Sequence, residues 1–77
     1  MLAKLGDVIR YDTGSTALMR VTHVSMGHGG AIARYYGEQF YGGSVGAYHE
    51  DCREASAVDL LHWAKREWLK VPQDAQP

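Results

Sequence analysis

The chain has 77 residues, of which 45% are hydrophobic and 22% are charged, and this composition is typical of a globular protein rather than a disordered one. A single domain of this length can build only a small core, so we expect it to associate into a homo-oligomer. Eight Lys and Arg residues against nine Asp and Glu residues give a formal net charge of −1, which argues against a dedicated duplex-DNA-binding protein.

The lone cysteine and the N-terminal residues suggest a cellular location. Cys52 cannot form a disulfide within the chain, and a reducing cytoplasm is the simplest setting for it. The N-terminus has no apolar stretch of the kind that signal peptides carry, and no apolar run approaches the roughly 20 residues that a membrane span needs. We therefore expect a cytoplasmic protein without a membrane-spanning segment.

Short β-branched and aromatic runs separated by turn residues predict four or five strands in the first two thirds of the chain. The predicted strands are residues 8–11, 16–24, 31–36 and 44–48, with residues 39–41 either extending the third strand past a bulge or forming a further one. Turns are expected at 12–15, 26–30 and 42–43, and Gly37-Glu38 is expected to interrupt the third strand.

The polar stretch 49–56 leads into one predicted helix over residues 57–70. Ser56, followed three residues later by Asp59, is a capping signal, and Pro72 is expected to end the helix and begin a flexible tail over 72–77. At 100° per residue, one arc of this helix is apolar and consists of Ala57, Leu60, Leu61, Ala64 and Trp68.

Together these elements predict an α+β fold for residues 1–71. We expect a small, strongly twisted antiparallel sheet, or an open SH3-like barrel, of four to five short strands with one C-terminal amphipathic helix over an open side or end.

Asp12-Thr13-Gly14-Ser15 resembles the catalytic loop of aspartic proteases, which pair two such loops so that two carboxylates share a proton. The second element of that family, an apolar pair followed by glycine, has no convincing copy here, and Arg10 and Tyr11 stand where the family has buried apolar residues. We therefore interpret the segment as a hairpin turn in which Asp12 caps the turn and Gly14 supplies a positive φ.

His49 and Cys52 have the spacing of half a zinc knuckle. A structural zinc site needs four ligands, usually in two such pairs, and the sequence offers no second pair. We predict no metal site, no cofactor and no catalytic residues. The glycine-rich loop 26–30 matches no nucleotide-binding motif, although its amides could bind an anion with His28 as a contact residue.

Five of the eight aromatic residues lie in residues 34–48, together with Arg34. Because a strand alternates its faces, neighbouring aromatic residues cannot all enter one core, and at least two must face away from it. They are either covered by Leu61, Ala64 and Trp68 of the helix or form a binding face, for which exposed Tyr and Arg are typical. The aromatic residues concerned are Tyr35, Tyr36, Phe40, Tyr41 and Tyr48.

Arginines occur once on each of the first three predicted strands, as Arg10, Arg20 and Arg34. If the strand registers allow, two or three of them could gather beside the tyrosines and bind phosphate, a nucleotide or an acidic protein surface. Otherwise they are solvated or paired with carboxylates such as Glu38.

Two segments, GDVIRYDTGSTALMRV and RYYGEQFYGGSVGAYHED, together cover roughly 34 of the 77 positions and resemble short uncharacterised proteins of phages and prophages. The resemblance implies a cytoplasmic accessory protein that acts by binding, and it transfers no catalytic residues.

The leading hypothesis is a non-enzymatic binding module that holds a protein or a small anionic, nucleotide-like ligand. Its candidate contact residues are Arg20, His28, Arg34, Tyr35, Tyr36, Phe40, Tyr41 and Tyr48. One alternative is a small nucleic-acid-binding barrel using Arg34, Lys65, Arg66 and Lys70, which the net charge disfavours. Another is an enzyme, either a protease acting through Asp12 or a metal-dependent one.

Overall fold

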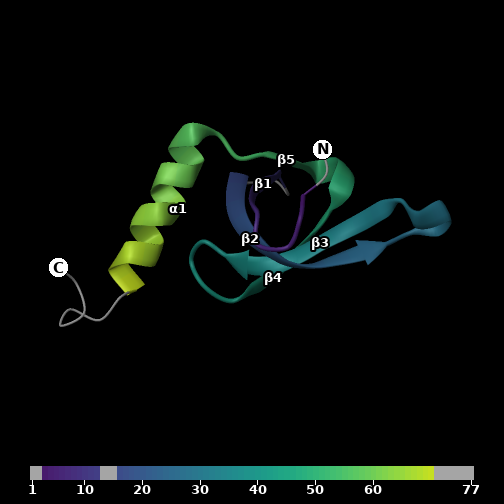
Figure 1. Ribbon diagram of the computed structural model, residues 1–77, viewed down its shortest axis with the longest axis horizontal. Helices are drawn as coiled ribbons and strands as arrows, with labels where there is room; N and C mark the ends of the chain where they lie inside the picture. Colours follow the sequence, from purple (N-terminus) through teal and green to yellow (C-terminus); the bar gives the residue numbers. More distant parts are fainter. Residues whose placement is uncertain (1–2, 13–15, 71–77) are drawn as a thin grey trace.

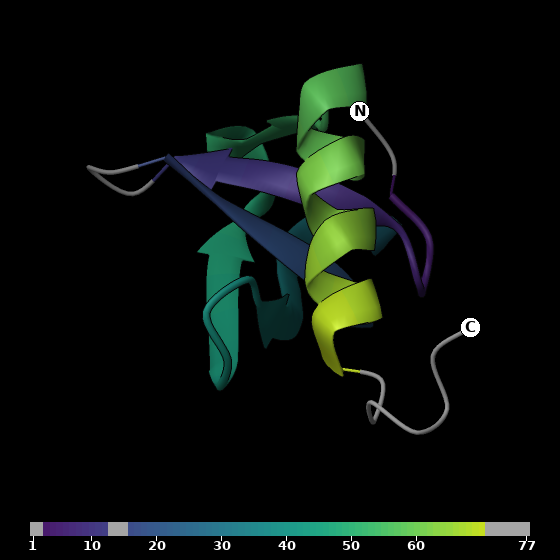
Figure 2. The same ribbon diagram turned by 90° about the vertical axis from the view of Figure 1, so that its left-hand side faces the viewer.

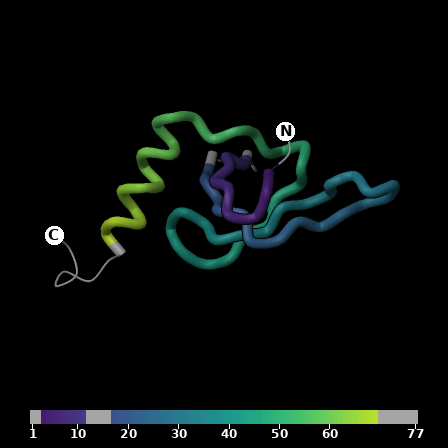
Figure 3. The backbone as a smooth tube through the Cα atoms, viewed as in Figure 1, coloured from purple at the N-terminus to yellow at the C-terminus, as the bar shows by residue number. Residues whose placement is uncertain are grey.

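The computed structural model, which describes residues 3–12 and 16–70, contains in that part of the chain one α-helix and one five-stranded antiparallel sheet (Figure 1). The strands are β1 (Val8–Asp12), β2 (Thr16–Met26), β3 (Ile32–Gln39), β4 (Ser44–Tyr48) and β5 (Cys52–Glu54), and the helix is α1 (Ala57–Lys70). The strand order is β4-β3-β2-β1-β5, so a meander of four strands is completed by β5 on the far side of β1. The sheet curls into an open half-barrel, which confirms the predicted α+β fold (Figure 3).

The curl of the sheet originates in β2, which is the longest strand and pairs on both sides. Its first half pairs with β1, and its second half pairs with β3 through two register shifts, between Val21 and His23 and between Ser25 and Met26. Such bulges bend a strand and increase its twist. β2 can therefore belong to both halves of the curled sheet.

The third strand is continuous, so the predicted interruption at Gly37-Glu38 is wrong. Gly37 lies inside β3 opposite Val21, where a Cβ atom would come within 2.0 Å of the carbonyl oxygen of Arg20. The glycine permits close approach of two strands at the bend of β2, and this is a known use of glycine within a strand. The strand ends at Gln39, and the predicted turn follows at Gly42 and Gly43, which both have positive φ.

A short fifth strand lies where the sequence predicted only a polar connection. After β4, residues His49–Asp51 form one turn of 3₁₀ helix, which redirects the chain so that Cys52–Glu54 pairs with β1. Pairing with a neighbour, rather than β propensity, makes these three residues a strand, because their composition is polar.

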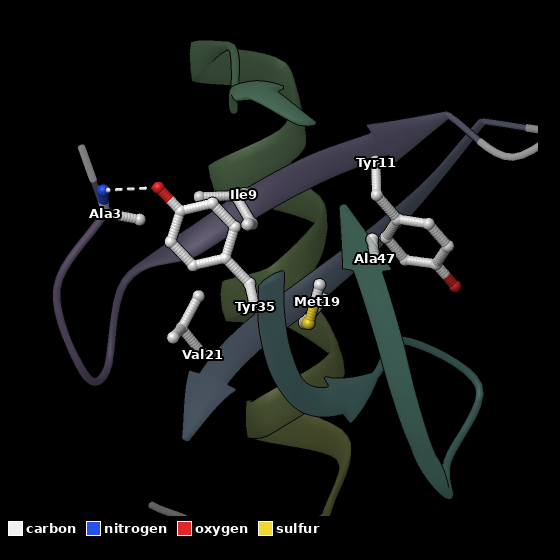
Figure 4. Close-up of a cluster of buried hydrophobic side chains, with 7 residues drawn as sticks. All are labelled: Ala3, Ile9, Tyr11, Met19, Val21, Tyr35 and Ala47. Carbon is white, nitrogen blue, oxygen red and sulfur yellow. Dashed lines mark hydrogen bonds between the residues drawn. The ribbon is translucent and has the colours of Figure 1, made fainter. Parts of the chain in front are cut away.

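The core lies on the concave side of the half-barrel (Figure 4). Tyr35 and Met19 are fully buried at its centre, and the Tyr35 hydroxyl accepts a hydrogen bond from the backbone N–H of Ala3 at 3.2 Å. The same hydroxyl lies 2.8 Å from Nδ1 of His49. The buried cluster consists of Ala3, Ile9, Tyr11, Met19, Val21, Tyr35 and Ala47.

Helix α1 lies against the outer face of the sheet, not over an open side or end of the barrel (Figure 2). Because Ile9, Tyr11 and Met19 point into the core, the paired residues Arg10 and Leu18 point the opposite way. Arg10 contacts Asp59 of α1, and Leu18 is buried although it does not belong to the core cluster. The helix thus covers the outer side of β1 and β2.

The side of α1 that faces the sheet is defined by Asp59, Trp63 and Arg66. Asp59 and Ser56 cap the helix reciprocally, as predicted, and Asp59 also accepts two hydrogen bonds from the Arg10 guanidinium. Arg66 donates to the carbonyl of Phe40 and pairs with Glu38 at 3.0 Å. The apolar arc from the sequence therefore covers none of the sheet aromatics and is exposed: Ala57, Leu60, Leu61, Ala64 and Trp68.

The predicted turn at 12–15 joins two strands that pair in register up to Asp12 and Thr16, so these strands form an antiparallel hairpin. The roles predicted for the Asp12 side chain and for Gly14 lie outside the described residues, as do the end of the helix at Pro72 and the tail over 72–77. No helix in residues 3–12 and 16–70 combines the length and the apolar character needed to cross a membrane.

Candidate functional site

The outer face of β3 and β4 is the part of the sheet on which the predicted tyrosines and arginine meet. Arg34 and Tyr36 point outward from β3, since Tyr35 between them points into the core. Their partners in register on β4 are Tyr48 and Gly46. We call Arg34, Tyr36 and Tyr48 the tyrosine–arginine face.

Arg34 is held between the two tyrosines. Its Nη2 donates to the hydroxyl of Tyr48 at 2.6 Å, its Nη1 lies 3.5 Å from the hydroxyl of Tyr36, and its Cζ lies 4.4 Å from the centroid of the Tyr48 ring. Hydrogen bonding to Tyr36 and the interactions with Tyr48 raise the pKa of Arg34. Within residues 3–12 and 16–70, no carboxylate pairs with this guanidinium. The face therefore carries a positive charge that the described chain does not neutralise.

Gly46 provides the space in which the Tyr36 ring lies. A Cβ atom on Gly46 would come within 2.8 Å of the ring, so one edge of the tyrosine ring occupies the space beside the glycine of the neighbouring strand. Two shallow hollows border the ring, one of about 150 Å³ beside Arg34 and Tyr48 and one of about 450 Å³ on the other side. The larger hollow is lined by Thr22, His23, Tyr36, Gly37, Ser44, Val45 and Gly46.

The sequence did not indicate that Thr22, His23 and Ser44 would line the larger hollow, or that Gly46 would make room for Tyr36. An isolated glycine within a predicted strand was the available signal, since it indicates a close approach of another group. Thr22 and His23 lie on β2 on either side of a register shift, and such a shift cannot be read from the sequence.

Tyr35 cannot contribute to a surface site, because it is fully buried in the core. The expectation that at least two large aromatic residues face away from the core is confirmed, and the exposed ones are Tyr36, Tyr41 and Tyr48. Sequence alternation predicts that Tyr35 and Tyr36 take opposite sides of the sheet, but not which of the two is buried.

Phe40 and Tyr41 lie next to the helix and apart from the tyrosine–arginine face. The Phe40 ring packs edge-on against Trp63 of α1, with 5.9 Å between the ring centroids. Tyr41 is 87% exposed and lies edge-on to Phe40. These two rings follow the end of β3, so they are not part of the strand alternation that aligns Arg34 with Tyr36.

The arginines of the first three strands do not gather into one cluster. Arg10 pairs with Asp59 of the helix, and Arg20 pairs with Glu38 at 3.2 Å. His28 lies exposed at the tip of the β2–β3 hairpin, at the far end of the molecule from α1 (Figure 1). Of the predicted arginines, Arg34 is the one beside the tyrosines.

His49 and Cys52 interact with different groups. His49 is 2.8 Å from the Tyr35 hydroxyl, and the Cys52 thiol lies 3.3 Å from the carbonyl oxygen of Tyr48. Burial, and secondarily the charge of Asp51, raises the pKa of the Cys52 thiol, so the reactive thiolate is disfavoured. In the part of the chain that the structure describes, no three His, Cys, Asp or Glu side chains are grouped so that they could hold a metal ion.

No protein family, curated protein or solved structure shows significant similarity to this chain.

Proposed function

We propose that the protein is a non-enzymatic binding module that recognises an anionic group on the tyrosine–arginine face. The observation that supports this proposal is the position of Arg34, which is exposed and has no carboxylate partner in the described chain. Hydrogen bonds to the two tyrosines use two of its five N–H donors, so three remain for a ligand. A guanidinium with free donors beside aromatic rings suits a carboxylate or phosphate attached to a larger group.

The partner that fits this face is a protein with an exposed acidic side chain or a small anionic, nucleotide-like ligand. The Tyr36 ring offers a flat apolar surface between the two hollows, and Thr22 and Ser44 add hydroxyl groups on the side away from Arg34. Tyrosine gives a large contact area at a low cost in side-chain entropy. In line with the resemblance to phage and prophage proteins, we place this activity in the cytoplasm.

Nucleic acid is the less favoured partner because Arg66, one of the cations proposed for it, is already engaged within the chain. Only 10% of the Arg66 side chain is exposed. Its guanidinium forms ion pairs with Glu38 and Glu67 and donates a hydrogen bond to the Phe40 carbonyl. A strand of nucleic acid needs several accessible cations along its backbone as well as aromatic rings.

An NMR titration of the uniformly ¹⁵N-labelled chain tests this proposal. The probes are AMP and a short poly-glutamate peptide, which represent the phosphate and the carboxylate. We expect shifts at residues of β3 and β4, and Arg34→Gln should weaken binding about tenfold or more, as loss of a charge-assisted hydrogen bond does.

Arg20→Gln is the matched control, because Arg20 is also an exposed strand arginine but is neutralised by Glu38. It should leave binding unchanged. The proposal is wrong if neither probe shifts β3 and β4 at millimolar concentration, or if both substitutions weaken binding equally.

A further inference from the structure

Strand β4 forms one edge of the sheet, and one side of its backbone has no strand partner among residues 3–12 and 16–70. The other edge strand, β5, is three residues long and carries Arg53 and Glu54, whereas β4 has five residues, no charged side chain and no bulge. Charged side chains, bulges and short length are the usual means by which proteins keep a sheet edge from pairing with another chain. β4 is therefore the edge that is open to a further strand.

The register of the β3–β4 pair shows which backbone groups point to this open edge. The N–H of Gln39 donates to the carbonyl of Gly43 at 3.0 Å, so these two residues form a hydrogen-bonded pair. Hydrogen-bonded and non-hydrogen-bonded pairs alternate along an antiparallel ladder, so Gly46 belongs to the second kind and points its N–H and C=O away from β3. The Tyr48 carbonyl faces the same way, since it accepts a hydrogen bond from the Cys52 thiol at 3.3 Å. Gly46 therefore presents one donor and one acceptor to a sixth strand.

A side chain placed opposite Gly46 on such a strand would lie beside Arg34. Residues directly opposite each other share a face, and Gly46 is on the outer face with its β3 partner Tyr36. The smaller hollow, of about 150 Å³, opens there and is lined by Arg34, Tyr36, Gly46, Ala47 and Tyr48. Neighbouring strands lie about 4.8 Å apart, and glycine has no side chain to intervene, so a glutamate on the added strand can reach over β4 to the guanidinium.

We propose that β4 binds an extended acidic segment of a partner protein as a sixth, antiparallel strand, with a glutamate opposite Gly46. The inference rests on the proposed recognition of an anionic group by Arg34, and it identifies that group as a carboxylate carried on a β-strand. Charge complementarity favours this occupant over a second copy of the chain, because β4 has no acidic side chain to offer Arg34. Antiparallel pairing is the more stable kind per residue and continues the pattern of the sheet.

The probe is the pentapeptide Thr-Val-Glu-Val-Thr, acetylated and amidated at its ends so that the glutamate is its only charge. Its valines would extend the inner side of β4, where Val45 is half-buried and Ala47 is buried. Binding to the full ¹⁵N-labelled chain is measured by NMR titration. We expect shifts at β4, and a dissociation constant about tenfold higher or more when glutamine replaces the peptide glutamate or when the protein carries Arg34→Gln, because a charge-assisted hydrogen bond is lost.

Methylation of single peptide nitrogens tests the strand pairing separately from the charge. In the proposed register the N–H of the peptide glutamate donates to the Gly46 carbonyl, whereas the N–H of the valine before it points away from β4. N-methylation at the glutamate should raise the dissociation constant about tenfold or more, because the methyl group replaces the donor and occupies the space between the strands. N-methylation at that valine is the matched control and should leave the dissociation constant unchanged.

Four outcomes would overturn this inference. If both methylated peptides bind as the parent does while Arg34→Gln weakens binding, the anion is recognised without strand pairing, and the proposed function stands alone. If AMP shifts β3 and β4 but the pentapeptide does not at millimolar concentration, the ligand is a small anion. If Arg34→Gln changes the binding of neither probe, the proposed function fails as well. A chain that is dimeric during the titration, with NMR contacts between the β4 strands of two copies, would assign the edge to a second copy.

Discussion

Gly37 shows how one residue without a side chain determines the shape of this sheet. It lies where β3 crosses the bend of β2, and the Arg20 carbonyl occupies the space that a Cβ atom would need. The obstacle is the backbone of the central strand, so it cannot turn aside as the end of a flexible side chain can. The two strands would have to separate to admit a methyl group.

We therefore predict that Gly37→Ala destabilises the protein by about 3 kcal/mol or more, or prevents folding. The free energy of unfolding, measured by urea denaturation, checks this. Gly46→Ala is the control within the same sheet, because its Cβ would meet the exposed ring of Tyr36, which can rotate away. A denaturation midpoint of Gly37→Ala equal to that of the wild type would contradict the prediction.

At the scale of the element, α1 is attached to the sheet by polar contacts more than by apolar ones. Trp63 packs on Phe40, while Asp59 and Arg66 form ion pairs to Arg10 and Glu38 on the outer side of the sheet. An isolated helix of this length is marginal in water, so these contacts decide whether and where it forms. Asp59 is central because it caps the helix and binds Arg10 at once.

Removing the charge of Asp59 should loosen the helix from the sheet. We predict that Asp59→Asn lowers the free energy of unfolding by about 1–3 kcal/mol, because the part-buried ion pair between Asp59 and Arg10 is lost while the cap survives in part. Urea denaturation followed by helical circular dichroism measures this loss. Glu50→Gln, at an exposed carboxylate in the 3₁₀ turn, should have no comparable effect.

The same pair predicts a pH dependence. The Arg10 guanidinium, and secondly the Ser56 backbone, hold the pKa of Asp59 well below its ordinary range. A carboxyl with a lowered folded-state pKa stabilises the fold fully above the ordinary aspartate pKa of about 4, and this contribution disappears as the pH falls through the folded-state pKa. The difference in unfolding free energy between wild type and Asp59→Asn should thus be constant from about pH 5 to 8 and shrink below about pH 4. A difference that grows in acid would contradict the assigned ion pair.

At the scale of the whole molecule, the shape is elongated, with principal extents of 49 × 20 × 19 Å. The far ends of β2 and β3 project as a hairpin on the side away from α1 (Figure 1). The buried cluster includes Met19, Val21 and Tyr35 on these strands, and Val24 and Ile32 pack against it half-buried, but residues 25–31 contribute nothing to it. The tip is therefore held mainly by strand pairing.

We predict that amide hydrogens of residues 25–31 exchange by local opening, well before global unfolding. Native-state hydrogen exchange by NMR measures this, and amides at Ile9, Met19 and Tyr35 serve as the slow reference because they lie in the core. Equal protection at the hairpin tip and in the core would show that the tip is part of the same cooperative unit.

The local chemistry of the chain was sufficient to predict four of the strands and the helix. Alternating β-branched and aromatic runs indicated four of the strands within a few residues, and the Ser56–Asp59 signal marked the start of α1. Alternation also showed that neighbouring tyrosines take opposite sides of the sheet. Alternation and capping depend only on residues that are close in sequence. They therefore hold in any fold that contains the element and can be predicted without knowing the fold.

Tertiary structure decided which side of each element is buried. The most apolar arc of α1 was available to face the sheet, but the carboxylate of Asp59 and the guanidinium of Arg66 found partners there, and a buried charge must be paired. The fifth strand and the position of Arg34 between two tyrosines likewise depend on register between segments distant in sequence. The sequence alone thus determined four strands, the helix and their order, while pairing across the sheet created the fifth strand and decided which surfaces remain open for partners, because pairing depends on residues distant in sequence.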